Sequence, residues 1–225
     1  MHTYDAPAPQ AGANLRTWIV LLFVMLVFLP IRQITHWISP TLNTESATVR
    51  EALIFAAAAA LLVYIRRVEG LSLRSVGLGT SVWWKSIAWG IALAIVCGGA
   101  AVLIAHATKF TGGPHANDLE RLPLWLVVTI VFRAGFVEEL FYRGFSIERL
   151  ISMGWPRPAA ALLPLTIFSL LHYTGGPVNV LIAFVLGAIL AAFYLWRRDL
   201  VANIIAHFLV DFVGNVAPRL VHHTS

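Results

Sequence analysis

The sequence predicts an all-α fold: a polytopic bundle of about seven transmembrane helices, with one further segment lying at the membrane interface. Hydrophobic residues make up 59% of the 225 residues and charged residues only 12%, against about half and about a quarter in soluble domains. The charged residues also cluster between long apolar runs, as they do in proteins that cross a bilayer. The composition therefore excludes an ordinary soluble domain and favours one membrane-embedded bundle.

Seven apolar runs are predicted to form the membrane helices. They cover residues 17–30, 51–64, 86–105, 122–153, 158–172, 178–196 and 200–216. Pro156 and Pro158 separate the fourth run from the fifth, and a Gly-Gly-Pro turn precedes the sixth. Residues 66–85 combine several charges with Trp83 and Trp84, which is typical of a segment at headgroup level.

The chain is predicted to form a single transmembrane domain, residues 17–218, between polar tails at residues 1–16 and 219–225. The first apolar run ends without a small-residue cleavage site, so we interpret it as a retained helix rather than a signal peptide. The only cysteine, Cys97, lies in an apolar run. This excludes both a disulfide framework and a cysteine-based metal site.

The distribution of basic residues predicts the orientation in the membrane. With seven crossings, one side carries Arg16, Arg66, Arg67, Arg74, Lys85, Arg143, Arg149, Arg157, Arg197 and Arg198, and the other carries Arg32, Arg50, Lys109, Arg121 and Arg219. The first side has about twice as many basic residues and is predicted to be cytoplasmic, which places the N-terminus in the cytoplasm and the C-terminus outside. The membrane is expected to be a cytoplasmic membrane of bacterial type. Loop lysines and arginines also account for the net charge of +5, so no nucleic-acid partner is expected.

Polar side chains interrupt three of the predicted membrane helices. They are Glu138, Glu139 and Arg143 in the fourth, His172 at the end of the fifth, and Asn203, His207 and Asp211 in the seventh. A charge at bilayer depth is costly, so intramembrane ionisable groups usually face a protein interior and serve a function. At 1.5 Å rise per residue, the glutamates and both histidines lie roughly 10–21 Å from the cytoplasmic ends of their helices. They are therefore predicted to share one layer of the bundle.

Spacing divides these residues into pairs. Glu139 and Arg143 stand at i and i+4, where a carboxylate and a guanidinium pair on one helix face. Glu138 lies about 100° around an α-helix from Glu139, so we assign it the chemistry and assign the Glu139–Arg143 pair a structural role. His207 with Asp211, and Phe168 with His172, repeat the i, i+4 spacing; the Phe168 ring is expected to wall the site.

Several interpretations of the pattern remain open. Glu139 with Arg143 can be a buried structural ion pair, and His172 can be a helix cap or an interface residue. His207 with Asp211 can be a buried hydrogen-bonded pair. Alternatively, a buried carboxylate beside histidines has the parts needed to activate water. Buried Glu, His and Arg also line proton or ion pathways, although the sequence shows no two-half symmetry of the kind common in transporters.

Three motifs carry a family resemblance. Glu138-Glu139-x-x-x-Arg143, Phe168-x-x-x-His172 and His207-x-x-x-Asp211 resemble, in order and separation, the signature motifs of the CAAX protease and bacteriocin-processing (CPBP) family. The resemblance covers roughly residues 122–216, and its best-known members are the type II CAAX prenyl endopeptidases. Asn often stands at the position of Asp211 in that family.

The resemblance implies an intramembrane endopeptidase that opens to the cytosol and cleaves a membrane-associated peptide or protein, prenylated or simply hydrophobic. Glu138 and His172 would activate the attacking water, while His207 and Asp211 would complete the site, supported by Glu139, Arg143, Phe168 and Asn203. Two mechanisms stay open. One uses a divalent metal, zinc, held by Glu138, His172 and His207; the other is metal-free. A His-Glu-x-x-His zinc helix is absent from the sequence.

The resemblance also keeps non-catalytic functions in view. One alternative to proteolysis is a non-catalytic membrane scaffold or bacteriocin-immunity protein that keeps the motif residues for folding. The relay interpretation given above is the other alternative to proteolysis.

Overall fold

The computed structural model describes residues 15–79, 81–112 and 116–222 of the chain, and in that part it contains helices and no strand. The all-α prediction is therefore confirmed for those residues. The elements are α1 (Leu15–Leu26), α2 (Phe28–Ile38), α3 (Thr44–Val63), η1 (Tyr64–Val68), η2 (Leu73–Val76), α4 (Trp83–Thr108), α5 (Ala116–Glu120), α6 (Leu124–Arg133), η3 (Ala134–Ile147), α7 (Glu148–Ser152), α8 (Arg157–Leu170), η4 (Tyr173–Gly175), α9 (Pro177–Arg197), α10 (Leu200–Asn215) and α11 (Ala217–His222).

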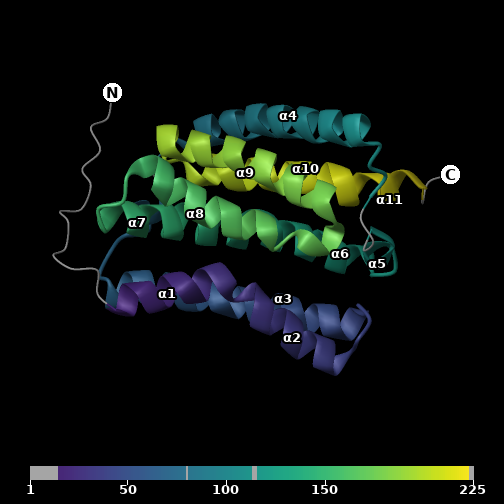
Figure 1. Cartoon of the computed structure of the whole chain (residues 1–225), viewed down its shortest axis with the longest axis horizontal. Helices are drawn as coiled ribbons and strands as arrows, with labels where there is room; N and C mark the ends of the chain where they lie inside the picture. Colours follow the sequence, from purple (N-terminus) through teal and green to yellow (C-terminus); the bar gives the residue numbers. More distant parts are fainter. Residues whose placement is uncertain (1–14, 80, 113–115, 223–225) are drawn as a thin grey trace.

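The long helices run side by side along the long axis of the molecule, with the connections at its two ends (Figure 1). α1, α2 and α3 form one outer layer and α4 lies on the opposite side. Between them, α10 packs against α4 and η3, and α8 packs against α9 and η3. The segment that carries the paired glutamates is therefore at the centre of the bundle, in contact with helices from both sides.

Three helices are long and apolar enough to cross a membrane: Thr44–Val68, Trp83–Thr108 and Pro177–Arg197. α1 and α2 give a fourth candidate if the bent pair counts as one span. α8 and α10 are apolar but have only 14 and 16 residues, which is shorter than the roughly 20 residues that a core of about 30 Å requires. The apolar helices indicate an integral membrane protein, while the count of seven spans stays a prediction.

The first predicted helix is replaced by two helices that meet at a bend of 48°. α1 ends at Leu26 and α2 begins at Phe28, two residues before Pro30. Proline has no backbone N–H and its ring clashes with the carbonyl of residue i−4, which here is Leu26. The bend therefore has a local cause in the sequence.

The fourth predicted helix is continuous, but its middle is a π-helix rather than an α-helix. η3 holds 14 residues and includes both glutamates and Arg143. A π-helix forms i→i+5 hydrogen bonds and is commonly found at functional sites; the Ser146 hydroxyl reinforces this pattern by donating to the carbonyl of Phe141, five residues back, at 2.7 Å. The assumption of 100° per residue is therefore wrong in this segment.

Two glycines of η3 allow its neighbours to approach closely. A Cβ at Gly135 would lie 3.0 Å from the backbone nitrogen of Phe208 in α10, and one at Gly144 would lie 2.9 Å from the carbonyl oxygen of Val76 in η2. Both distances are too short for a methylene group. These positions bring η3 against α10, and hence the first motif against the third.

The segment predicted to lie at the interface is tied to the bundle rather than crossing it. It contains the short π-helix η1 and the short 3₁₀-helix η2, with Val76 fully buried. Arg149 of α7 donates to both carboxylate oxygens of Glu69, at 2.8 and 2.6 Å. Trp83 and Trp84 begin α4 with exposed rings.

Most of the two predicted polar tails lies outside the described residues, which begin at Leu15 and end at His222. α11 includes Arg219, whose guanidinium donates to the carbonyls of Leu119, Glu120 and Leu122 at 3.5, 3.2 and 2.8 Å. This contact attaches the end of the chain to the segment that precedes α6.

Candidate active site

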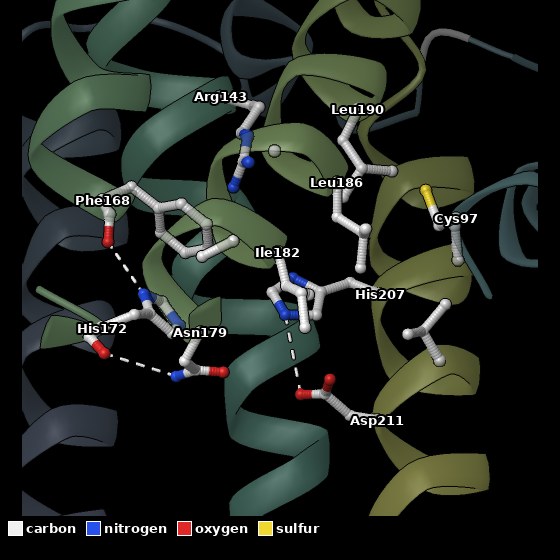
Figure 2. A pocket seen from close by; sticks show the side chains of 14 residues that line it. Cys97, Arg143, Phe168, His172, Asn179, Ile182, Leu186, Leu190, His207 and Asp211 are labelled. Carbon is white, nitrogen blue, oxygen red and sulfur yellow. Dashed lines mark hydrogen bonds and ion pairs between the residues drawn. The ribbon is translucent and has the colours of Figure 1, made fainter. Parts of the chain in front are cut away.

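Two cavities meet at Phe168 and His172. The smaller, of about 110 Å³, lies between α8, α9 and α10 (Figure 2) and is lined by Cys97, Arg143, Phe168, His172, Asn179, Ile182, Ala183, Leu186, Gly187, Leu190, Ala206, His207, Val210 and Asp211. The larger, of about 620 Å³, reaches from Glu138 and Arg133 to the exposed α2–α3 turn, where Pro40 and Thr41 line it. One aromatic ring and one imidazole therefore separate a small inner space from a large open one.

Glu139 is the centre of a closed, fully buried network. Its Oε1 accepts hydrogen bonds from Nη1 of Arg143 and from Nδ1 of His207, each at 2.9 Å. Its Oε2 accepts one from Nδ2 of Asn203 at 3.1 Å, and the same amide nitrogen donates to the carbonyl of Leu190 at 3.0 Å. The predicted i, i+4 contact between Glu139 and Arg143 is present, and every partner of Glu139 is internal to the protein.

Glu138 belongs to a different network and lines the larger cavity. Its carboxylate forms an ion pair with Nη1 of Arg133. Nε of Arg133 donates a hydrogen bond to Glu51 at 2.8 Å, and Glu51 also accepts one from Nε of Arg50 at 2.9 Å. The two neighbouring glutamates therefore point to different partners, as predicted, but Glu138 is held by an arginine that sequence reasoning did not assign to the site.

Arg133 and Glu51 are the functional candidates that the sequence analysis missed. Both are charged residues inside or beside predicted spans, and both are buried, with 9% and 3% of their side chains exposed. The signal that could have found Arg133 is its place in the same helix, five residues before Glu138. Glu51 gives a weaker signal, because nothing in the sequence shows that α3 lies beside α6.

His172 follows α8 and its ring orientation is fixed by the backbone. Its Nδ1 lies 2.8 Å from the carbonyl oxygen of Phe168. A carbonyl only accepts hydrogen bonds, so Nδ1 carries the proton and Nε2 of the neutral ring keeps its lone pair. Asn179 donates to the carbonyl of His172 at 3.3 Å. It packs over Gly175, where a Cβ would lie 2.7 Å from the Asn179 Cγ.

His207 is held from both ends of its ring. Nδ1 contacts Glu139 at 2.9 Å, and Nε2 lies 3.6 Å from Oδ2 of Asp211, whose side chain is 32% exposed. Figure 2 shows His207 and Asp211 on one side of the smaller cavity, opposite Phe168 and His172. The predicted i, i+4 pair thus forms, with His207 also part of the Glu139 network.

Phe168 contacts the rings and charges on both sides of it. Its centroid lies 4.7 Å from that of His172 and 6.3 Å from that of His207. The guanidinium carbon of Arg143 lies 4.5 Å from the same centroid, within cation–π range. Phe168 therefore occupies the position of the wall that its spacing predicted.

The side chains proposed as zinc ligands do not converge. Among the described residues, no three His, Cys, Asp or Glu side chains form a group that could hold a metal ion. The Glu138 carboxylate is bound to Arg133, and Nδ1 of His207 is bound to Glu139. An open zinc site needs three such donors directed at one point. Glu138, His172 and His207 do not fit that site in this arrangement, so no step below is assigned to a metal.

The comparisons with known proteins bear on the same part of the chain. Residues 120–213 match the family model described as Type II CAAX prenyl endopeptidase Rce1-like. The matched segment contains all three motifs and ends just after Asp211, whereas Glu51 and the α1–α4 half of the bundle lie before it. No curated protein and no solved structure matches the chain.

Proposed function

We propose that this chain, whose residues 120–213 match the family model described as Type II CAAX prenyl endopeptidase Rce1-like, is an intramembrane endopeptidase that hydrolyses a peptide bond with water activated between Glu138 and His172. The family and the apolar helices support a membrane-embedded protease at the level of the family. The residues in catalytic roles, the mechanism and the substrate are our proposal.

One observation carries the assignment: Glu138 and His172 line the same open cavity, and each presents a proton acceptor. The carboxylate of Glu138 is paired with Arg133. Because Nδ1 of His172 contacts the carbonyl of Phe168, Nε2 is the acceptor of that ring when it is neutral. Glu139, by contrast, is 0% exposed and its oxygens are occupied by three donors. A general base must lie within hydrogen-bond reach of the water that it deprotonates, and Glu138 meets that condition where Glu139 does not.

The chemistry then follows from the wall between the cavities. A water molecule in the larger cavity donates one hydrogen bond to Nε2 of His172 and transfers its other proton to Glu138 while its oxygen attacks the scissile carbonyl, held beside Phe168. The resulting oxyanion is stabilised by hydrogen-bond donors aimed at it; His207 donates from Nε2 when its ring is protonated. Collapse of the intermediate breaks the C–N bond, and the proton on Glu138 passes to the leaving amine. Asp211 is a positioning residue, because it acts on the His207 ring.

The substrate is a membrane-associated peptide or protein segment, hydrophobic or lipidated. A cavity of about 620 Å³ is in the size range of ligand-binding clefts. It begins among helices that are apolar enough for a bilayer and ends at an exposed turn, so an extended peptide can enter it from the end of the bundle. A family of prenyl endopeptidases makes a prenylated peptide the first substrate to test, and an unmodified hydrophobic peptide the second.

Replacing Glu138 with glutamine tests the proposal directly. Glu138→Gln keeps the size of the side chain and one acceptor for Arg133 but removes the base, so turnover of a prenylated or hydrophobic peptide should fall about 10²–10⁴-fold. The matched control is Glu45→Gln, the same change in the exposed first turn of α3, which should cleave at the wild-type rate. Both variants should elute and unfold as the wild type does.

Near wild-type cleavage by purified Glu138→Gln would contradict the proposal. A scaffold or an ion relay would then be the better interpretation. Loss of cleavage together with loss of folding would show only that the residue is structural, so peptide binding by the folded variant is measured in the same experiment.

A further inference from the structure

We propose that the smaller cavity is a side-chain specificity pocket that accepts an uncharged side chain up to about the size of glutamine, with Arg143 donating a hydrogen bond to its tip. This inference rests on the proposed function and goes beyond it, since it names the residue preference next to the scissile bond. It uses a cavity and an unpaired donor that the hydrolytic steps above leave unexplained.

The position of the cavity connects it to the site. Phe168 and His172 line both cavities, and His207 lines the smaller one. A scissile bond held at this wall would therefore place the side chain of an adjacent residue at the entrance of the smaller cavity. Figure 2 shows Asp211 and Asn179 towards one end of the lining residues and Arg143 at the opposite end. The Asp211 side chain is 32% exposed, so we take its end as the entrance.

Size limits what can enter. The cavity measures about 110 Å³, whereas an engineered cavity of about 150 Å³ holds benzene. A leucine or glutamine side chain has fewer heavy atoms than benzene, and a phenylalanine side chain has more. The side walls are aliphatic, formed by Ile182, Leu186 and Val210, so the stem of a medium-sized side chain is the group that fits them.

The inner end of the cavity requires a hydrogen-bond acceptor. Nη2 of Arg143 is buried and has no hydrogen-bond partner among the described residues, although Arg143 is only 1% exposed. A buried donor left without an acceptor costs about 1–3 kcal/mol. Gly187 packs closely against it, because a Cβ there would lie 2.8 Å from Nη2, so a larger residue would displace the guanidinium from the inner end of the cavity. The guanidinium is therefore aimed at a ligand atom.

Charge decides between a neutral acceptor and a carboxylate. Arg143 is already paired with Glu139, and Asp211 lies at the entrance. The two carboxylates balance Arg143 and His207 even when the His207 ring is protonated, so no positive charge is left over for a second anion. An additional buried carboxylate would be uncompensated, which is strongly unfavourable. A glutamine amide supplies an acceptor without that cost.

A peptide series tests the pocket. One hydrophobic Ala/Leu peptide is prepared in detergent with Gly, Leu, Gln, Glu or Phe at the position beside the bond that mass spectrometry shows to be cut. Wild type should cleave in the order Gln, Leu, Gly, with Glu and Phe at least 100-fold slower than Gln, since a pocket contact changes kcat/KM by about 10–200-fold. Preference for Glu over Gln, or equal rates for Phe and Gln, would overturn the inference.

Two substitutions of opposite sign change the volume of the pocket. Val210→Phe should fill it and reduce the Gln/Gly ratio of kcat/KM at least tenfold, while the Gly peptide is still cleaved. Val213→Phe is the matched control: Val213 lies on the same helix, α10, but is 65% exposed, so the same change there should leave the ratio unchanged. Ile182→Ala should enlarge the pocket and raise the rate for the Phe peptide.

The outcomes separate this inference from the proposed function. Cleavage that depends on Glu138 but shows the same Gln/Gly ratio in wild type, Val210→Phe and Ile182→Ala would overturn the pocket alone. Cleavage that persists in Glu138→Gln, or absence of cleavage of every peptide in both its prenylated and its unmodified form, would overturn the proposed function and the pocket together.

Discussion

The two cavities that meet at Phe168 and His172 differ in size, in lining and in exposure. The larger contains charged groups from several segments, among them Arg32, Arg121, Arg133 and Glu138, and it reaches exposed residues of the α2–α3 turn. The smaller has aliphatic side walls, with His172, His207 and Asp211 also in its lining and one unpaired guanidinium nitrogen at its inner end. The first is suited to admit water and a peptide backbone, and the second to select a side chain.

The neighbouring glutamates follow the same division. Glu138 belongs to the open side, through Arg133 and Glu51, and Glu139 belongs to the closed side, through Arg143, His207 and Asn203. Adjacent carboxylates with identical chemistry thus occupy environments that differ in access to water. A general base must be accessible to water, which favours Glu138, whereas the hydrogen-bonded network around Glu139 fixes the positions of its side chains. The comparison therefore predicts separate roles for the two glutamates, which mutations can distinguish.

The largest expected effect concerns the open side. His172→Ala should lower turnover by about 10²–10⁴-fold, as loss of Glu138 does, and the double variant Glu138→Gln/His172→Ala should be only slightly slower than either single variant, because residues that act as one unit are non-additive. The measurement is kcat/KM on one peptide for all four proteins. Multiplicative effects would mean that the two residues act in separate steps.

The second prediction concerns the closed side. Arg143→Ala removes the guanidinium that compensates the charge of buried Glu139 and leaves only the contacts with His207 and Asn203, so the free energy of unfolding should fall by about 3–5 kcal/mol. Denaturant titration in detergent measures the loss, and Arg67→Ala, which removes an exposed arginine of η1, should change it by less than about 1 kcal/mol. A stable, inactive Arg143→Ala protein would move Arg143 from the structural network into the reaction itself.

The third prediction concerns two substitutions that perturb the protein least. Labelling them determines which side of the membrane the larger cavity faces. Ser72→Cys and Thr41→Cys place a thiol on exposed residues at opposite ends of the bundle, and the native Cys97 is buried. From the distribution of lysine and arginine, we expect a membrane-impermeant reagent to label Ser72→Cys only from the cytoplasm and Thr41→Cys only from outside. The wild-type chain should stay unlabelled.

That result would separate two expectations that agreed at the level of sequence. The basic residues favour a cytoplasmic position for the η1–η2 end, while the family resemblance implies a site open to the cytosol. In the structure the larger cavity opens at the other end, beside Thr41. Labelling of Ser72→Cys from outside would restore a cytosolic entrance; the expected pattern would mean that the peptide arrives from the opposite side of the membrane.

The helices themselves could be read from the sequence, and the exceptions have identifiable causes. Apolar runs predicted every long helix, because burying apolar surface and satisfying the backbone internally leave few alternatives in a bilayer. The bend between α1 and α2 could have been inferred from Pro30. The π-helical form of η3 could not, since π-helices are rare and η3 acquires its wider turns while packed against α8, α10 and η2.

The site was predictable to the extent that its partners lie on the same helix. The i, i+4 spacings gave the Glu139–Arg143, Phe168–His172 and His207–Asp211 contacts, each of which is present. The contacts of Glu51 with Arg133 and of His207 with Glu139 join residues 82 and 68 positions apart. Such contacts depend on which helices become neighbours, and one sequence does not state that.

The sequence by itself determined that this chain is a helical membrane protein with intramembrane carboxylates and histidines in three motifs, because hydropathy and helical spacing are local properties. Only the tertiary structure decided that Arg133 and, through it, Glu51 are the partners of Glu138, and that Phe168 and His172 divide a large cavity from a small one. The physical reason is that access to water and the identity of a buried partner are properties of packing between helices, and a single motif contains neither.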